Sequence, residues 1–217
     1  MATTMSRPKK PSRSGNDKPA MPADVVRLIS AQDHWTEAEF LALDNNIGAW
    51  MIELVNHRLE ILPMPTPYHQ DIVIFLLMAL REFVMPRRLG RVYVSPMPVH
   101  LFPGTMREPD IVLVKKHRLK DKRKPPEGAD LVMEVVSPGT DNHVRDLEDK
   151  RADYAKAKIP EYWIVDPETK TITVLTLSGR SYKVHGEFKA GKMAVSKLLK
   201  GFKVAVSDVF AAGDAKG

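Results

Sequence analysis

Two acidic residues of this sequence stand inside apolar stretches, where a carboxylate needs a partner. Asp110 lies in the stretch 109–114 (PDIVLV) and Glu134 in the stretch 131–136 (LVMEVV), and both stretches are typical of strands. Burying a carboxylate is unfavourable unless a cation or hydrogen bonds compensate its charge. Magnesium prefers oxygen ligands and commonly binds one or two carboxylates together with a substrate phosphate. The two acids therefore point to metal-assisted phosphodiester chemistry.

Lys150 is the third candidate, and it lies on a helix predicted over 142–158. On a helical wheel it falls on the same side as Leu147 and Tyr154, within the stripe that should face the sheet. A lysine in such a stripe either extends its ammonium to solvent or points at a negative charge. Asp146 lies four residues earlier at the edge of the stripe, so a surface pair with Lys150 is the alternative that the wheel leaves open.

Apolar periodicity, capping residues and proline breaks predict the elements that position these side chains. Thr36 and Glu39 have the spacing of a capping box, which predicts the start of a short helix. The further predicted elements are a strand pair over 50–62 turning at Asn56 and His57, a helix over 69–84 ended near Pro86, strands over 91–101 and 107–114 joined by a turn at Pro103 and Gly104, a strand over 131–136, the helix over 142–158, a hairpin of strands 161–166 and 171–177, and a strand over 202–206 followed by a short terminal turn. This succession predicts an α/β or α+β sandwich.

The net charge of +6 over 217 residues belongs mostly to the N-terminus. Residues 1–20 hold five basic side chains against one acid, which leaves the remaining chain at about +2. Residues 1–22 are rich in Pro and Ser and lack an apolar pattern, which predicts a disordered tail, either a solvated extension or an aid to phosphate binding. We expect a single domain over 23–212 and a short C-terminal tail over 213–217.

Composition and motifs exclude several classes of protein. The absence of cysteine excludes a thiolate nucleophile and a Cys-ligated zinc, and it fits a reducing cytoplasm. The N-terminus has no apolar segment typical of a secretory signal, and the longest apolar run, 72–80, is too short to span a bilayer. No GxGxxG, GxxxxGK[ST] or GxSxG motif is present, which argues against nucleotide-cofactor folds and an α/β hydrolase.

The segment 115–126 is densely basic, with seven Lys and Arg residues. Like charges at this density repel, so the segment predicts an exposed, mobile loop. Two interpretations remain open: a solvated loop, or a surface that contacts a phosphate backbone, because the segment directly follows the strand that bears Asp110.

Three segments together resemble one known family. They are EPDIVLV, LVMEVVSPGT and DLEDKRADYAKAKIPEYWIVDPETKTITV, and the resemblance extends upstream to WTEAEFLAL and IELVNHRLEILPMPTPYHQ and downstream to LLKGFKVAVSDVF. They resemble the Uma-two family of restriction-endonuclease-like proteins, a branch of the PD-(D/E)xK nuclease superfamily. The resemblance implies a restriction-endonuclease-like core, in which a central mixed β-sheet is flanked by helices.

The resemblance also implies roles for individual residues. Asp110 corresponds to the acid of the PD element and Glu134 to the acid of the (D/E)xK element, with the main-chain carbonyl of Val135 as a further metal ligand. This sequence departs from the superfamily pattern at Val136, where a lysine is expected, and Lys150 resembles the relocated lysine of this branch.

Two further positions follow from the same resemblance. Glu53 fills the upstream acid position, and His69 heads the first long helix near the same site, where it would hydrogen-bond a phosphate or support a carboxylate.

These residues predict a metal-dependent endonuclease that hydrolyses phosphodiester bonds in DNA. Mg²⁺, or Mn²⁺ in its place, would be held by Asp110 and Glu134, and Lys150 would orient the attacking water or neutralise developing charge. The alternative is a catalytically weak or inactive nuclease fold that serves as a nucleic-acid-binding or dimeric interaction module. We expect a cytoplasmic protein with DNA as its partner, no membrane association, and a possible homodimer, since duplex cleavage needs two active sites.

Overall fold

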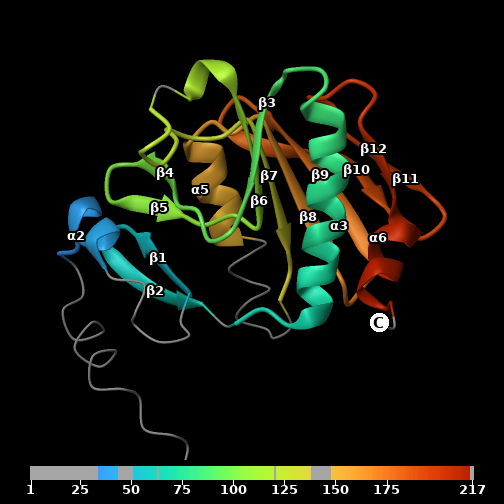
Figure 1. Ribbon diagram of the computed structural model, residues 1–217, viewed down its shortest axis with the longest axis horizontal. Helices are drawn as coiled ribbons and strands as arrows, with labels where there is room; N and C mark the ends of the chain where they lie inside the picture. Colours follow the sequence, from blue (N-terminus) through green and yellow to red (C-terminus); the bar gives the residue numbers. More distant parts are fainter. Residues whose placement is uncertain (1–33, 44–50, 63, 120, 138–147, 216–217) are drawn as a thin grey trace, which may run out of the picture.

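A mixed six-stranded sheet forms the centre of the molecule (Figure 1). The computed structural model describes residues 34–43, 51–62, 64–119, 121–137 and 148–215. The strands of this sheet, in spatial order, are β10 (Ser181–Phe188), β9 (Thr171–Ser178), β8 (Glu161–Asp166), β7 (Leu131–Val135), β6 (Ile111–Lys115) and β3 (Gly90–Val94). Only β7 and β8 pair in parallel within this sheet. This arrangement confirms the predicted fold class, a central mixed sheet flanked by helices.

Alternate residues of the central strands face two separate cores, as expected for a sheet covered on both sides. On one face, Ile111 and Met133 pack with the helix α3 (Pro67–Val84) and the C-terminal helix α6 (Val206–Gly213). On the other face, Val112 and Val132 pack with α5 (Lys150–Lys156). Glu134 on β7 therefore lies in a sheet with little access to solvent, and Asp110 lies directly before β6.

A second, four-stranded sheet lies beside the first and carries Glu53 and Arg107. Its strands, in spatial order, are β2 (Arg58–Leu62), β1 (Met51–Val55), β5 (Thr105–Arg107) and β4 (Val99–Phe102). The hairpin of β1 and β2 turns at Asn56 and His57, as predicted. The short helix α2 (Glu37–Ala42) begins with the predicted capping box of Thr36 and Glu39. Met51 and Leu62 of this sheet line the same pocket as Asp110.

The two strands predicted over 91–101 and 107–114 are each split in two. The chain leaves the large sheet after β3, forms β4 and β5 in the small sheet, and returns as β6. The breaks fall at residues 95–98 and 108–110, which contain prolines. Proline has no N–H to donate to a ladder, so it interrupts pairing at these points. Consequently Asp110 lies at the entry to β6, where the chain crosses between the sheets.

Other boundaries differ more modestly from the predictions. The predicted helix over 142–158 is described from Lys150 to Lys156, and its expected start lies outside the described residues. The strand β10 was not predicted, because most of its residues are exposed and its apolar pattern is weak. The expected terminal turn is the eight-residue helix α6, which follows β11 (Met193–Val195) and β12 (Lys203–Ala205).

The strand directions define two ends of the large sheet. Asp110 precedes β6 and Glu134 lies near the end of the antiparallel strand β7, so both lie at one end, here called the Glu134 end. Lys115 ends β6 at the opposite end, here called the Lys115 end, where β7 and β8 begin. Both α3 and α5 begin at the Glu134 end, since His69 contacts Val135 and Lys150 contacts Glu134.

Candidate active site

Asp110 and Glu134 come together at the Glu134 end, as the sequence analysis expected. The Asp110 carboxylate accepts a hydrogen bond of 2.8 Å from the backbone N–H of Val135, which ties the entry of β6 to the end of β7. Glu134 is only 2% exposed. Both acids line a pocket of about 280 Å³, together with His69, Glu108 and Lys150. The pocket thus gathers the charged groups of four separate elements.

Lys150 supplies an ammonium group to this pocket. It is the first residue of α5, and its Nζ lies 2.8 Å from Oε2 of Glu134. Its side chain is buried, so it does not form a solvent-exposed surface pair; Asp146, the alternative partner, lies outside the described residues. One helical turn later, Tyr154 donates a hydrogen bond to Oε1 of Glu134. Burial and the charge of Glu134 raise the pKa of Tyr154 well above its ordinary value, so this phenol remains a donor.

His69 lies between the two oxygens that the family resemblance implicates in metal binding. Its Nε2 is 3.0 Å from the carbonyl oxygen of Val135 and 3.3 Å from Oδ2 of Asp110. Both partners are acceptors, which assigns the proton to Nε2. Burial alone would lower the pKa of His69, but the hydrogen bond and charge of Asp110 outweigh it and raise the pKa. His69 therefore supports a carboxylate, one of its two expected roles.

Glu53 lies behind the pocket lining rather than on it. It is fully buried, and its two oxygens accept hydrogen bonds from Arg107 (2.9 Å) and from the backbone N–H of Glu108 (2.8 Å). Burial would raise the pKa of Glu53, but the charges of Lys150 and Arg107 outweigh it and hold the pKa below its usual value. Glu53 thus remains ionised and close enough to Lys150 to affect the electrostatics of the site.

Arg107 is a central residue that the sequence analysis did not identify. Its side chain is 1% exposed and contacts three carboxylates, with distances of 2.9 Å to Glu53, 2.7 Å to Glu60 and 2.7 Å to Asp153. It links β5 to β1, β2 and α5, because Asp153 lies on the same helix as Lys150. The signal in the sequence is slight: an arginine directly after the apolar Met106, at the start of the strand predicted over 107–114.

Glu108 is a pocket residue that sequence reasoning also missed. It lies two residues before Asp110, and both side chains line the pocket. Burial, followed by the negative charge of Glu53, raises the pKa of Glu108 to about 7, although Lys150 opposes this shift. The pocket therefore contains a carboxyl group that exchanges a proton near neutral pH.

The donor set partly fits a divalent metal ion. Oδ2 of Asp110 and the carbonyl of Val135 both face one atom, His69 Nε2, so these two oxygens converge on a common point. Two carboxylates and a carbonyl are oxygen ligands of the kind that magnesium prefers, with water and phosphate completing the coordination. Within the described part of the chain, however, no three His, Asp or Glu side chains form a metal-binding cluster. The fit thus depends on the main-chain carbonyl and on ligands from outside the protein.

The mixed sheet, its flanking helices and the acids at one strand end define a restriction-endonuclease-like protein. Residues 37–207 match the model of the Uma2 family, described as "Putative restriction endonuclease", and the chain belongs to that family.

A solved structure from Anabaena variabilis, titled a "putative nuclease belonging to DUF820", is similar in fold. Its TM-score is 0.67 at 19% identity, and the match covers 82% of this chain and 98% of that one. Among curated proteins, none matches. The resemblance that the sequence analysis identified is thereby confirmed.

Proposed function

We propose that this protein is a metal-dependent endonuclease that hydrolyses phosphodiester bonds in DNA. The observation that carries the proposal is the contact between Lys150 and Glu134 beside Asp110, because it unites two acids and an ammonium group from three elements in one pocket. Membership of the Uma2 family supports a nuclease acting on nucleic acid. None of the described helices is both long and apolar enough to cross a membrane.

Asp110, Glu134 and the carbonyl of Val135 would hold Mg²⁺ or Mn²⁺. Such an ion polarises the phosphate and lowers the pKa of a bound water. Asp110 is held in place by the N–H of Val135, and Glu134 by Tyr154 and Lys150. Because both acids are fixed before the substrate arrives, little reorganisation is needed when charge develops on the phosphate.

Lys150 replaces the lysine that the superfamily pattern places at Val136. Val136 has an apolar side chain, which is buried in the core beneath α5 and brings no charge to the site. Lys150 brings an ammonium group to the same carboxylate from the start of α5. There it would orient the attacking water or stabilise negative charge on the phosphate.

Glu53 and His69 would act without contacting the metal. Glu53 fixes the backbone of Glu108, and the charge of Lys150 helps to keep Glu53 ionised. His69 orients Asp110 and Val135 through its Nε2 proton. Both roles match those of outer residues that hold metal ligands in position.

One observation favours a second candidate, a nuclease fold that binds nucleic acid without cutting it efficiently. Both oxygens of Glu134 already accept hydrogen bonds, and the described residues supply no third metal-binding side chain. A weak metal site would reduce turnover while leaving the fold intact.

Cleavage of plasmid and single-stranded DNA, with Mg²⁺ or Mn²⁺, distinguishes the two candidates. The wild type is compared with Asp110→Ala and with Lys192→Ala, an exposed control outside the pocket. Metal-dependent nicking that is lost only in Asp110→Ala supports the endonuclease. DNA binding without cleavage in any metal, and without a metal-induced rise in melting temperature, supports the binding module.

A further inference from the structure

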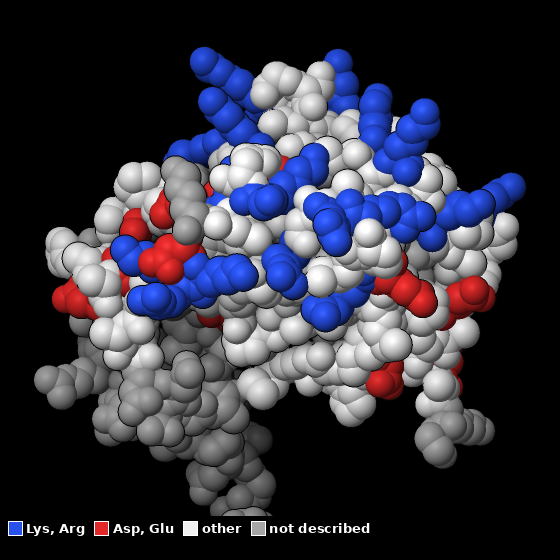
Figure 2. Space-filling model, turned by 45° about the horizontal axis from the view of Figure 1, so that its top comes forward, with Lys and Arg blue, Asp and Glu red and all other residues white. Residues whose placement is uncertain are grey.

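Exposed basic residues gather at the end of the large sheet that lies opposite the proposed active site. Figure 2 shows Lys and Arg across this end, with Asp and Glu mostly at its margins. Six exposed members of this group, here called the basic end, are Arg88, Arg91, Lys116, Lys122, Lys158 and Arg180. None of the six forms an ion pair with a carboxylate of the described residues.

Strand topology places these residues at the Lys115 end. Arg91 pairs with Val114 near the end of β6, and Lys116 follows that strand directly. Lys158 precedes β8, and Arg180 lies in the turn between β9 and β10. Five residues of β6 separate Asp110 from Lys116, and at about 3.3 Å per residue they span about 17 Å. Lys116, in the basic segment that follows this strand, is therefore remote from Asp110, and the two interpretations of that segment, a solvated loop or a phosphate-contact surface, concern the Lys115 end.

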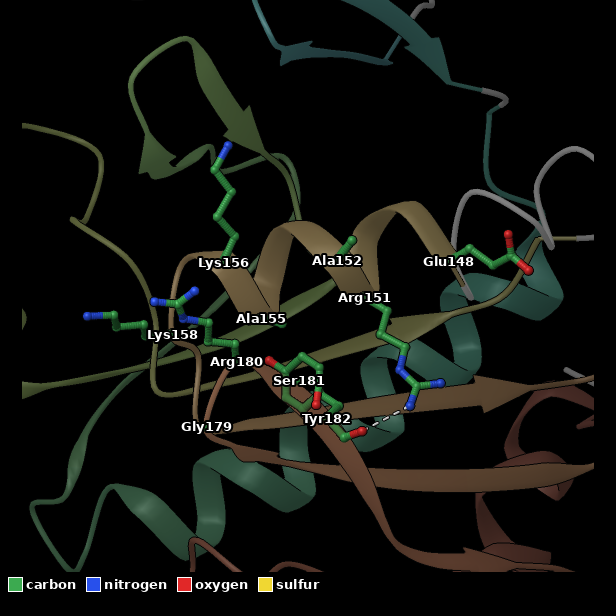
Figure 3. Close-up of a pocket in the computed structure, with 10 residues that line it drawn as sticks. All are labelled: Glu148, Arg151, Ala152, Ala155, Lys156, Lys158, Gly179, Arg180, Ser181 and Tyr182. Carbon is green, nitrogen blue, oxygen red and sulfur yellow. Dashed lines mark hydrogen bonds between the residues drawn. The ribbon is translucent and has the colours of Figure 1, made fainter.

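Two hollows flank this end of the sheet. One, of about 380 Å³, lies where α3 ends and β3 begins, and it is lined by Arg88, Arg91, Lys116 and Lys122. The other, of about 620 Å³, lies between the end of α5 and the turn before β10. In the second hollow, Lys158 and Arg180 extend to the same side, whereas Arg151 turns to the backbone of Tyr182 (Figure 3). Each hollow thus offers at least two cations without a carboxylate partner.

The spacing of these cations fits an extended polyanion better than a small anion. From β3, which carries Arg91, to β9, which precedes Arg180, the sheet crosses four strand steps, or about 19 Å at roughly 4.8 Å per step. A single phosphate cannot reach both hollows. A nucleic-acid backbone carries a charge at every nucleotide and contacts several such cations at once.

We infer that the basic end is a second nucleic-acid contact surface, which binds the phosphate backbone at a distance from the bond to be cut. The inference rests on the proposed action on nucleic acid. A duplex rises about 3.4 Å per base pair, so about ten base pairs are long enough to reach from the Asp110 pocket to this surface. Contacts of this kind strengthen binding without reading sequence.

Salt-dependent binding of duplex DNA tests the inference. The experiment uses the Asp110→Ala protein without added metal, so the outcome does not depend on cleavage. Two variants are made in this Asp110→Ala background. The first is the double change Lys116→Gln/Lys158→Gln, which removes one lysine from each hollow. The second is the control Lys189→Gln/Lys192→Gln. The control lysines are exposed and follow β10, whose last residue Phe188 pairs with Ile172 at the Glu134 end.

For a 20-base-pair duplex, we expect the basic-end double variant to lower the slope of log Kd against log salt by about two, at about 0.9 per lost phosphate contact. Adding Arg88→Gln and Arg180→Gln should lower it by about four and weaken binding at least tenfold at 100 mM salt. For a duplex of about six base pairs, which is too short to reach from the Asp110 pocket across the basic end, the change in slope should be smaller.

Unchanged slopes in the quadruple variant would overturn the inference, as would an equal loss in the control. Loss of binding to phosphatidylserine vesicles without loss of duplex binding would also overturn it, in favour of a lipid surface. If the wild type cuts no DNA but the basic-end variants lose duplex binding, the surface stands and only the proposed nuclease activity fails.

Discussion

Lys150 and Glu134 form a buried ion pair between two elements that are distant in the sequence. They lie 16 positions apart, yet Nζ and Oε2 are separated by 2.8 Å, with both side chains almost fully buried. A buried charge pair is costly to break from one side, because the remaining charge is left without compensation. This relationship gives the first prediction.

Replacing Lys150 by Met should lower the cleavage rate at least 100-fold, because the ammonium group is lost. It should also lower the free energy of unfolding by about 3 kcal/mol, because Glu134 then stays buried without its cation. The double variant Glu134→Gln/Lys150→Met should recover most of the stability and none of the activity. Urea unfolding and single-turnover cleavage measure the two effects. Tyr154→Phe serves as the control, since it removes only a neutral donor from Glu134; a loss of activity equal to that of Lys150→Met would contradict the assigned role of Lys150.

Arg107 should be the most sensitive position of the small sheet. Its burial and its three carboxylate partners predict that Arg107→Met destabilises the protein by about 3–5 kcal/mol. Arg107→Lys should rescue little, because a lysine cannot reproduce the planar fork that binds several carboxylates. Chemical denaturation checks both. Glu60→Gln, whose side chain is 37% exposed, should cost no more than about 1 kcal/mol; a cost similar to that of Arg107→Met would refute the ranking.

His69 should hold two of the proposed metal ligands in position. Its Nε2 proton contacts the carbonyl of Val135 and the carboxylate of Asp110. His69→Phe keeps a ring of similar size without that proton, so we expect Mn²⁺ to bind several-fold more weakly in calorimetry. Leu76→Met, a buried change on the same helix, controls for altered packing. Tighter Mn²⁺ binding in His69→Phe would show that the histidine competes with the ion instead.

His100 should make stability depend on pH. Its two ring nitrogens lie 2.6 Å from Glu127 and 3.1 Å from Glu37. Burial would lower the pKa of His100, but these two acids outweigh it and raise the pKa. A raised folded-state pKa stabilises the protein fully below the unfolded value of about 6.5, and the contribution disappears as pH rises through the folded pKa.

The free energy of unfolding of the wild type should therefore exceed that of His100→Gln by more at pH 6 than at pH 9. Urea titrations at both pH values measure this difference. His185→Gln, at an exposed position on β10, provides the control. If the stability difference between the wild type and His100→Gln grew as the pH rises, the prediction would be wrong.

The sequence alone determined the elements whose signals are local. The capping box at Thr36, the turn at His57 and the helix ending at Val84 depend on neighbouring residues, and all three occur in the structure. The acids Asp110 and Glu134 stood out because each lies in an apolar run, where a charge is conspicuous. Family resemblance added Lys150, whose inward direction the helical wheel had left open.

Only the tertiary structure decided which charged groups meet. Arg107 binds acids from β1, β2 and α5, and Glu108 shares the pocket of Asp110 because the chain crosses there between two sheets. The position of Lys116 at the far end of β6 likewise depends on strand direction. Strand order and direction result from the burial of both sheet faces together, which no short window of sequence contains.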